Sequence, residues 1–368
     1  MKVAILHDWL NQKVGGAEAV LFQLAEMYPG ADIYTIIYNP KKFDKYLSDR
    51  KIKTSKLQKL PNFFKKRPKL LLPFVKNAVE SFDLSGYDLI ISSSSAWVKN
   101  ANIPSEARHV CYCYSPARML WDSWPKYVDE IKIGPVLKFY IIKLASQLRI
   151  WDYYKSQEGT EFIAISNHVS GRIRKFYRLD SLVIYPPVNL KPFINPTKEY
   201  TKKDYYLIVS ILAKYKNIEL AIKAFKDSGK NLVIAGDGPD LKRLKEIAAD
   251  HENIVFLGRV SDNHKTRLMR EAKGFIFTNV EDFGITMVES IASGTGVIAL
   301  SGGGANEIIK DGKTGVFYKE PNEEYLNRAI VKYEKTILSG GRFNNDYISK
   351  KFSENVFMEK FQEVINAK

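Results

Sequence analysis

The stretch GFIFTNVEDFGITMVESIASGTGVIAL, residues 274–300, contains the alternation that decides the fold. Its two ends, 274–279 and 296–300, are short apolar runs that predict buried β-strands. Between them lie a loop and a helical stretch that we expect to begin near Thr286. A strand, a helix and a second strand in this order form a unit whose two strands run parallel in one sheet.

The same alternation continues in both directions along the chain. Further strands are expected at 3–7, 31–37, 88–94, 109–114, 161–166, 182–187, 205–211, 231–236, 254–258 and 315–318. Helices are expected from Ala17 to Met27, from Pro135 to Ser156, and from starts near Asn217, Asp240, Asp262 and Asn306. This pattern predicts the α/β class, with parallel sheets covered by helices.

The 368 residues are enough for two such domains. The Pro186-Pro187 pair bars a helix, so we place the boundary there, with domains at 1–186 and 187–351. The last segment, 352–368, is amphipathic and predicts a helix. It can pack on its own domain or cross back to the first domain.

Composition and charge narrow the class of protein. Hydrophobic residues make up 45% and charged residues 26%, which excludes a disordered chain, and the net charge of +15 predicts an anionic partner. Residues 51–79 contain nine basic residues and no acidic one, interleaved with bulky apolar side chains. This mixture favours an interfacial membrane segment over a nucleic-acid-binding face. A solvated basic helix with a buried apolar side is the alternative.

The sequence also excludes several kinds of site and segment. It has no run of about 18 apolar residues to span a membrane, and its start does not resemble a signal peptide. Cys111 and Cys113 would share a face of one strand, so we expect neither a disulfide nor a zinc site, and a reducing cytoplasm. Gly236-Asp237-Gly238 lacks the third glycine of a dinucleotide fingerprint. No Asp-x-Asp pair is present to hold a divalent metal.

Three groups of residues could bind a phosphorylated ligand. Gly15-Gly16 follows the first strand and opens a helix, where amide groups can meet a diphosphate. Glu281 and Glu289 flank a second helix start, whose amides at Thr286, Met287 and Val288 can meet a phosphate while a carboxylate accepts ribose hydroxyls. Lys216 lies between a strand and a helix, at the edge of the sheet where ligands bind. Each of these could instead be an ordinary turn, helix start or surface lysine.

Together these residues resemble the retaining glycosyltransferases of the GT-B fold, family 4, and most closely the bacterial mannosyltransferases of O-antigen assembly. The resemblance runs nearly end to end. It rests on HDWL with GGAE (7–18), DLSGYDLIISSS (83–94), CYCYSPARMLWD (111–122), VIYPPV (183–188), YKNIELAIKAF (215–225), AGDGP (235–239), FLGRVSD (256–262) and VEDFGITMVESIASGT (280–295).

The resemblance implies two Rossmann-like domains facing each other across a cleft. The first would bind the acceptor, with 352–368 returning to it, and the second would bind the sugar nucleotide. The expected reaction moves a hexose, with mannose from GDP-mannose as the best guess, to a lipid-linked saccharide with retained configuration. No metal or other cofactor and no nucleic acid is expected. The expected location is the cytoplasmic face of the plasma membrane, contacted through 51–79.

The resemblance also implies roles for individual residues. Glu281 faces the transferred sugar and Lys216 binds the donor diphosphate, so these two are the expected catalytic residues. The other expected donor contacts are Gly15, Gly16, Lys214, Gly258, Arg259, Val260, Phe283, Gly284, Ile285, Thr286, Met287, Val288 and Glu289. Tyr114 and Ser115 are expected on the acceptor side.

Two positions depart from the family pattern. Ile211 stands where the family usually has an arginine that binds the diphosphate, and Lys214 is a nearby substitute without a bidentate fork. Tyr114 stands where the family has a histidine, and a tyrosine cannot titrate near neutral pH. The alternatives are therefore a UDP-sugar-dependent transferase, another GT-B enzyme, or a weakened homologue acting as a nucleotide- or partner-binding subunit.

Overall fold

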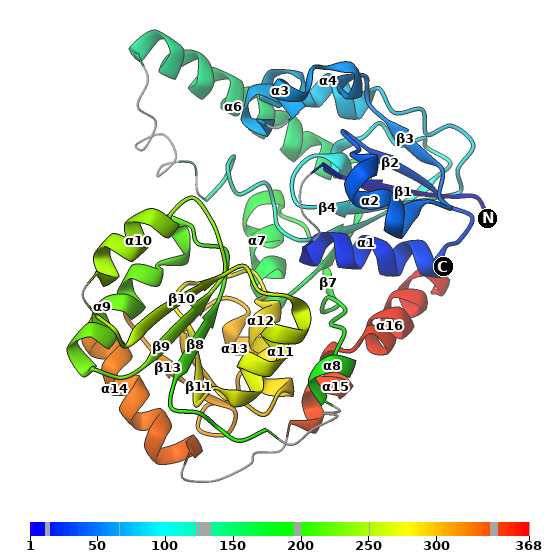
Figure 1. The fold of residues 1–368 in the computed structure, drawn as a ribbon. Helices are drawn as coiled ribbons and strands as arrows, with labels where there is room; N and C mark the ends of the chain where they lie inside the picture. The colour runs from blue at the N-terminus through cyan, green and yellow to red at the C-terminus, as the bar shows by residue number, and fades with distance from the viewer. Residues whose placement is uncertain are drawn as a thin grey trace. The chain divides into compact units, whose positions relative to one another are not determined.

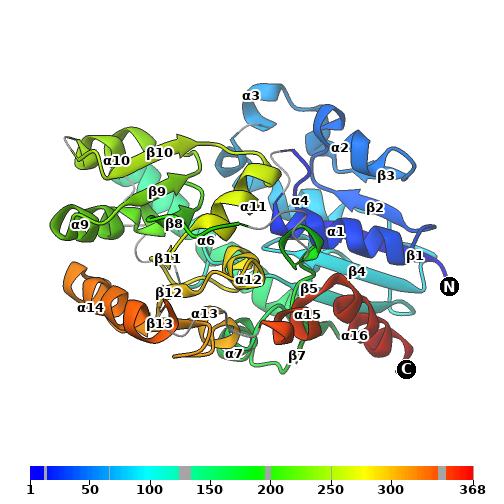
Figure 2. The same cartoon turned by 60° about the horizontal axis from the view of Figure 1, so that its bottom comes forward.

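The computed structural model describes residues 1–11, 15–65, 67–122, 124, 134–194, 200–249, 251–338 and 345–367. The chain forms two compact units (Figures 1 and 2). Unit 1 comprises Met1–Pro187 and Phe357–Lys368, and unit 2 comprises Val188–Val356. Each unit is built on one sheet in which every strand pair is parallel. The predicted α/β class is therefore confirmed.

Unit 1 has a seven-stranded sheet in the order β3-β2-β1-β4-β5-β6-β7. Its strands are β1 (Val3–His7), β2 (Asp32–Thr35), β3 (Ile52–Thr54), β4 (Leu89–Ser94), β5 (Arg108–Cys113), β6 (Glu161–Ala164) and β7 (Leu182–Val183). Its helices include α1 (Gly16–Met27), α2 (Pro40–Leu47), α3 (Asn62–Lys65), α4 (Val75–Glu80), α6 (Pro135–Ser156) and α7 (Asn167–Tyr177), with short 3-10 helices η1 (Lys56–Lys59), η2 (Pro68–Phe74) and η3 (Val98–Asn100).

Unit 2 has a six-stranded sheet in the order β10-β9-β8-β11-β12-β13. Its strands are β8 (Tyr206–Val209), β9 (Leu232–Ala235), β10 (Ile254–Gly258), β11 (Gly274–Phe277), β12 (Val297–Leu300) and β13 (Gly315–Tyr318). Its helices include α8 (Lys191–Ile194), α9 (Ile218–Ser228), α10 (Leu241–Ala248), α11 (Asp262–Glu271), α12 (Ile285–Ala292), α13 (Ala305–Ile308), α14 (Glu323–Tyr333) and α15 (Asp346–Phe352), with the 3-10 helix η4 (Lys214–Lys216) and the π-helical η5 (Glu334–Leu338).

Alternate strand residues build the core of unit 2. Tyr206 and Ile208 on β8 and Leu232 and Ile234 on β9 join one buried cluster with α9, α10 and α14. Because successive strand residues point to opposite faces, Leu207, between the first pair, faces away from this cluster, and it too is fully buried. Both faces of the sheet are covered, which explains why these strands read as continuous apolar runs.

The core of unit 1 has two different faces. On one face, side chains of β1 and β4 pack with η2, α4 and the second half of α6 in one cluster. Elsewhere Tyr112 of β5 makes edge contacts with Phe357 and Phe361 of α16 (Glu354–Asn366). Arg108 donates to the carbonyl oxygens of Val364 and Ile365, at 2.9 and 2.6 Å, which satisfies the end of α16. These contacts hold the last helix on unit 1.

One sequence expectation needs correction, and the bounds of another are now fixed. Residues 51–79 form no continuous helix: the edge strand β3, which has one apolar residue and so escaped prediction, is followed by four short helical pieces. Pro61, Pro68 and Pro73 explain the breaks, because proline removes a helical hydrogen bond. The expected helix over 352–368 is present as α16, which begins at Glu354 because the backbone of Ser353 is extended. Of the nine basic residues of 51–79, Lys66 lies outside the described residues.

Candidate functional site

The loop that joins β11 to α12 is fixed by backbone packing against another loop. Gly284 is the N-cap of α12 with a φ of 101°, and Phe283 before it is buried. A Cβ atom at Gly304 would lie 2.1 Å from the Phe283 carbonyl oxygen, and one at Gly303 would lie 2.1 Å from that of Glu281. The Gly304 amide donates to the Glu281 carbonyl oxygen at 2.9 Å. Only glycine fits at these two positions, which hold the Glu281 loop in place.

The role of residues 302–304 was not predicted from the sequence, although three successive glycines after a buried strand were a usable signal. Gly236 and Gly238 were rejected as a dinucleotide fingerprint, and their function was not predicted either. A Cβ atom at Gly236 would lie 1.8 Å from the Ser210 carbonyl oxygen, and one at Gly238 would lie 2.2 Å from that of Leu212. These two glycines therefore allow the β9–α10 loop to support the β8–α9 loop, which leads to Lys216.

Lys216 and Glu281 form an ion pair. The Lys216 ammonium donates to Glu281 Oε1, and the two side chains are only 15% and 24% exposed. Thr278 Oγ1 donates to the Lys216 carbonyl oxygen at 2.6 Å, and Asn279 Nδ2 donates to Glu281 Oε1 at 3.3 Å. The two residues meet because β8 and β11 are neighbours, so the loops after them share the carboxyl edge of the sheet. That edge is where α/β proteins bind ligands.

Glu289 lies in the second turn of α12, one turn later than expected. Lys265 on α11 donates to its Oε1 at 2.7 Å, whereas its Oε2 is buried and has no hydrogen-bond partner among the described residues. Burial raises the pKa of the Glu289 carboxyl above its usual value, and the Lys265 ammonium opposes this rise. A buried acceptor without a donor is costly, so this oxygen fits a ligand hydroxyl group.

The amides expected to meet a phosphate differ in availability. The Met287 amide donates to the Gly284 carbonyl oxygen at 3.0 Å, and the side chains of Met287 and Val288 are fully buried. Ile285 and Thr286 are half-buried, and α12 has no side-chain cap at Gly284 within the described part of the chain. Among the described residues, therefore, no side-chain cap neutralises the positive end at the first turn of α12.

The remaining predicted donor residues of unit 2 lie on the same edge of its sheet. Gly258 ends β10 with a φ of 65°, followed by the exposed Arg259 and the half-buried Val260. Ile211, where the family pattern has an arginine, is 61% exposed in the β8–α9 loop. Lys214 is also exposed in that loop and begins η4. The structure thus brings the predicted donor residues of unit 2 to one edge of its sheet. Ile211 stands there in place of the arginine that the family pattern has.

The glycine turn of unit 1 is closed by its own helix. The Gly15 amide donates to Glu18 Oε2 at 2.7 Å, and the backbone of Gly15 is extended. Gly16 begins α1. Burial works against ionisation of Glu18, but hydrogen bonds to His7 and to backbone amides outweigh it, so the pKa of Glu18 lies below its usual value. A carboxylate therefore already occupies one amide that was expected to meet a diphosphate.

Tyr114 links the glycine turn to the sheet. Its hydroxyl donates to the Ala17 carbonyl oxygen at 2.9 Å and shares a hydrogen bond with Ser93 Oγ at 2.7 Å. Burial raises the pKa of the Tyr114 phenol. Ser115 is buried, and its Oγ donates to the Pro116 carbonyl oxygen at 2.9 Å. Both predicted acceptor-side hydroxyls thus have partners within unit 1, and their role toward an acceptor stays a prediction.

Asp8, directly after β1, is a buried carboxylate that sequence analysis did not single out. Its Oδ1 accepts the amides of Trp97 and Val98, both at 2.8 Å, and its Oδ2 accepts those of Ser95 and Ala96, at 2.6 and 2.9 Å. These bonds fix the loop after β4 to the end of β1. The signal was an aspartate placed directly after a buried strand.

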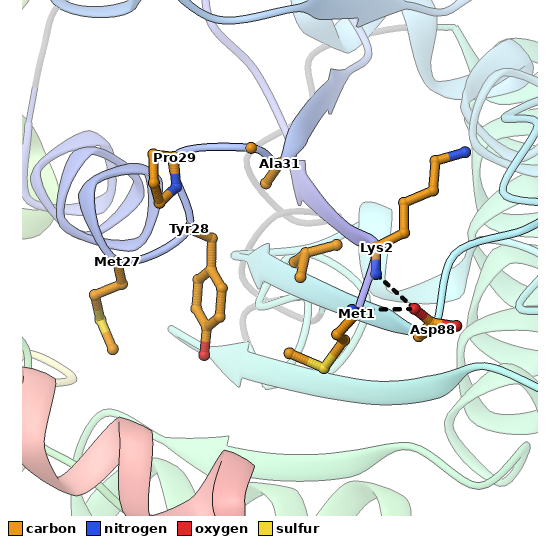
Figure 3. A pocket seen from close by; sticks show the side chains of 9 residues that line it. Met1, Lys2, Met27, Tyr28, Pro29, Ala31 and Asp88 are labelled. Carbon is orange, nitrogen blue, oxygen red and sulfur yellow. Dashed lines mark hydrogen bonds and ion pairs between the residues drawn. The ribbon is translucent and has the colours of Figure 1, made fainter.

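A cavity of about 620 Å³ lies elsewhere, near the beginning of β1 and the end of α1 (Figure 3). It is lined by Met1, Lys2, Val3, Met27, Tyr28, Pro29, Gly30, Ala31 and Asp88. None of the predicted site residues is among them. In the part of the chain that the structure describes, no group of three or more His, Cys, Asp and Glu side chains could hold a metal ion.

Comparison with known proteins identifies the class of this fold. The crystal structure of HepE from Anabaena in complex with UDP matches over 100% of both chains, with a TM-score of 0.70 and 17% identity. That match and the two parallel sheets establish the GT-B fold, as the resemblance of the motifs implied.

The comparison of sequences gives a family match within unit 2. Residues 191–342 match the model of the family "Glycosyl transferases group 1". The alpha-1,3/1,6-mannosyltransferase ALG2 of Dictyostelium discoideum is 24% identical over 97% of both chains. The O-antigen chain mannosyltransferase RfbU of Salmonella typhimurium is 28% identical over 53% of this chain and 56% of its own. The chain spans 61% and 37% of the length of two archaeal relatives. The chain is thus similar to glycosyltransferases, and residues 191–342 in its second unit match the group 1 glycosyl transferase domain.

Proposed function

We propose that this protein is a retaining hexosyltransferase that moves a hexose from a nucleotide diphosphate sugar to a lipid-linked saccharide in cell-surface polysaccharide assembly. The observation that carries the proposal is the pairing of Lys216 with Glu281 beside the uncapped start of α12. A cation, a carboxylate and a positive helix end then lie at one edge of a parallel sheet, and they match a diphosphate joined to a sugar.

Donor binding exchanges the partners of these side chains. In this proposal Lys216 turns from the Glu281 carboxylate to the diphosphate, which carries more charge. Glu281 is then released to accept hydroxyl groups of the transferred sugar, beside the backbone of Phe283, Gly284 and Ile285. The ion pair keeps both residues charged and in place until a donor arrives.

Glu289 supplies the proposed ribose contact. Its Oε2 atom is buried and lacks a donor among the described residues, while Lys265 holds the other oxygen. A ribose hydroxyl group donating to Oε2 satisfies that atom. Gly258, Arg259 and Val260 border the base in this arrangement.

The proposed chemistry is a front-face substitution that retains configuration. The bond from the sugar to the donor phosphate breaks, and the acceptor oxygen bonds to the same face of the sugar. The leaving phosphate takes the acceptor proton. Lys216 and the amides at the start of α12 stabilise the charge that develops on the phosphate, so the proposal needs no metal ion.

The proposed donor is GDP-mannose, and the proposed acceptor is a sugar on a polyprenyl diphosphate. Support comes from the relatives named as mannosyltransferases, one of which acts on the O-antigen chain. The solved relative HepE is in complex with UDP, so a UDP-sugar is the alternative donor. Residues 51–79 are the proposed contact with the anionic inner face of the plasma membrane, at which the protein is peripheral.

One observation favours a second candidate function. Ile211, at the position of the family's second diphosphate-binding cation, is exposed and apolar. A weakened homologue that binds a nucleotide or a partner subunit would tolerate this residue. Activity of a variant with Ile211→Arg separates the two candidates, because only a true transferase with reduced donor affinity gains turnover from the added fork.

The experiment that tests the main proposal measures nucleotide release from a panel of GDP-, UDP- and ADP-sugars. Turnover of one donor that falls about 100-fold or more in Lys216→Ala and in Glu281→Ala supports it. Lys223→Ala is the matched control, since that exposed lysine on α9 pairs only with surface carboxylates in the described structure and its loss leaves turnover unchanged. If the wild type shows neither turnover of any donor nor binding of any nucleotide, the proposal is contradicted.

A further inference from the structure

The first half of α6 exposes an unusual number of large apolar side chains. Val136, Leu137, Phe139 and Tyr140 are 70%, 54%, 63% and 62% exposed. Large apolar residues usually occur singly on a protein surface, so a cluster of four within five positions marks an interaction site. None of the site residues described above lies on this helix.

The two halves of α6 have different surroundings. Ala145, Leu148 and Trp151 in the second half are buried in the cluster that also contains Leu71 and Val75. The first half extends away from that cluster (Figure 1). The helix therefore has an anchored half within unit 1 and an exposed half, both in one uninterrupted α-helix.

The exposed half of α6 has a wide apolar face. With 100° between successive residues, the directions of Val136, Leu137, Phe139, Tyr140 and Ile142 span an arc of about 220°, somewhat more than half of the circumference. A groove on a partner protein covers one face of a helix and would leave the rest of these side chains in water. A membrane interface accommodates an apolar face as wide as this one, so this distribution suits insertion into lipid better than docking in a groove.

Charge points to the same occupant. Residues 134–151 contain Lys138, Lys143 and Arg149 and no acidic residue. The basic segment 51–79 belongs to the same unit, and its exposed Phe63, Phe64, Leu70 and Phe74 have the same apolar character. A second copy of this chain would bring like charges together, whereas an anionic lipid surface neutralises them.

We propose that the exposed half of α6 inserts its apolar side chains into the interfacial region of an anionic membrane and holds unit 1 there. This inference rests on the proposed function, because it names a second contact with the membrane partner proposed above. Residues 51–79 supply mainly charge, and α6 supplies apolar area. Helices that lie in the interfacial region of a membrane typically combine aromatic and basic residues.

The test is sedimentation with vesicles of phosphatidylglycerol and phosphatidylcholine. Leu137→Ser with Phe139→Ser is expected to weaken binding by about tenfold or more, since both side chains leave the lipid. The matched control is Val331→Ser on α14, an apolar side chain 45% exposed in unit 2, which leaves binding unchanged. All three substituted positions are exposed, so we expect circular dichroism to show that the double variant and the control variant are folded.

A spectroscopic readout tests insertion itself. Phe139→Trp gives a reporter whose emission shifts to shorter wavelength and is quenched by brominated lipid, which a purely electrostatic contact does not produce. The chain's own five tryptophans provide the background, measured in the wild type. Val331→Trp is the control and gives no added quenching.

The remaining outcomes separate this inference from the proposed function. Wild-type binding by the α6 double variant, together with loss of binding when Lys59 and Lys65 are changed to Gln, overturns the inference and leaves the membrane partner in place. If the wild type does not bind the vesicles, both this inference and the proposed membrane partner are overturned. A concentration-dependent dimer that disappears in the α6 double variant, with vesicle binding unchanged, assigns this surface to a second copy and also overturns the inference.

Discussion

The starts of α1 and α12 have similar places in their units but differ in whether a carboxylate caps them. Both helices follow a buried parallel strand through a loop that contains glycine. Glu18 folds back on the Gly15 amide and closes the start of α1 from within its own helix. No described side chain caps the start of α12 at Gly284, and the nearby Glu281 bonds instead to Lys216 from another loop.

This difference indicates which of the two helix starts is ready for an anion. A carboxylate on an N-terminal amide already neutralises the positive end of α1, so a diphosphate there has to displace it. No described side chain caps the start of α12, and the Glu281 carboxylate before it is paired with Lys216. We therefore expect unit 2 to bind anions more strongly than the start of α1 does.

The largest effect is expected from breaking the support under α12. Gly304→Ala places a Cβ atom against the Phe283 backbone, so we expect a loss of about 3 kcal/mol in the free energy of unfolding. Nucleotide binding should fall with it, because the Glu281 loop has to move. Denaturant unfolding and a nucleotide titration measure the two effects. Gly30→Ala is the control, since a Cβ atom there meets nothing within 4 Å. Wild-type stability of Gly304→Ala would contradict the packing argument.

A second prediction concerns Glu289 and pH. Burial raises its pKa, so the carboxylate is lost on acidification at a higher pH than for an exposed glutamate. If ribose needs that carboxylate, donor affinity falls as pH drops through the raised pKa. Lys265→Met removes the opposing cation and moves the fall to still higher pH, whereas Lys265→Arg keeps it in place. Donor dissociation constants across pH provide the measurement.

Two further results belong to the Glu289 prediction. Glu289→Gln should cost about tenfold or more in donor affinity and make that affinity independent of pH in this range. The sign for stability is opposite. The native state holds the Glu289 proton longer than the unfolded chain, so the free energy of unfolding falls as pH rises through the window between the ordinary and the raised pKa. A donor affinity that is the same at all pH values would remove Glu289 from the ribose site.

A smaller effect is expected at the start of α1. Glu18→Ala removes the partner of the Gly15 amide and should cost about 1 kcal/mol of stability, as lost helix caps do. Donor affinity should change much less than with Glu289→Gln. Thermal unfolding and the same donor titration compare the two variants. An equal loss of donor affinity in Glu18→Ala would break the contrast between the helix starts.

The smallest effect is expected from Tyr114→Phe. The variant loses the hydrogen bonds to Ala17 and Ser93 but keeps the ring, so stability should fall by about 1 kcal/mol or less. Turnover with a soluble acceptor analogue reports any additional role. A large fall in turnover at unchanged stability would place the hydroxyl at the acceptor, as the sequence predicted.

Most of the fold could be predicted because its signals are local. Strands such as β10 and β13 are apolar runs bounded by glycine or polar residues, and both were predicted with their observed bounds. The edge strand β3 was missed because one apolar residue among polar neighbours gives no pattern. The single helix expected as an alternative over 51–79 was wrong because three prolines interrupt it.

The candidate site was less predictable, because its decisive features are long-range. The residue types Lys216, Glu281 and Glu289 could be selected from their places after strands. Their partners could not: Lys265 reaches Glu289 from a different helix. The roles of Gly303 and Gly304 depend on how closely two loops approach, which no local pattern encodes.

The last helix has a consequence for the order of synthesis. Arg108 and Tyr112 of β5 find partners in residues 357–365, which leave the ribosome only after all of unit 2. Domains usually fold in the order in which they are made. Here the unit translated first is completed last, and until then its aromatic surface around Tyr112 stays uncovered. The nascent chain therefore exposes for a time an aromatic surface that the finished protein covers.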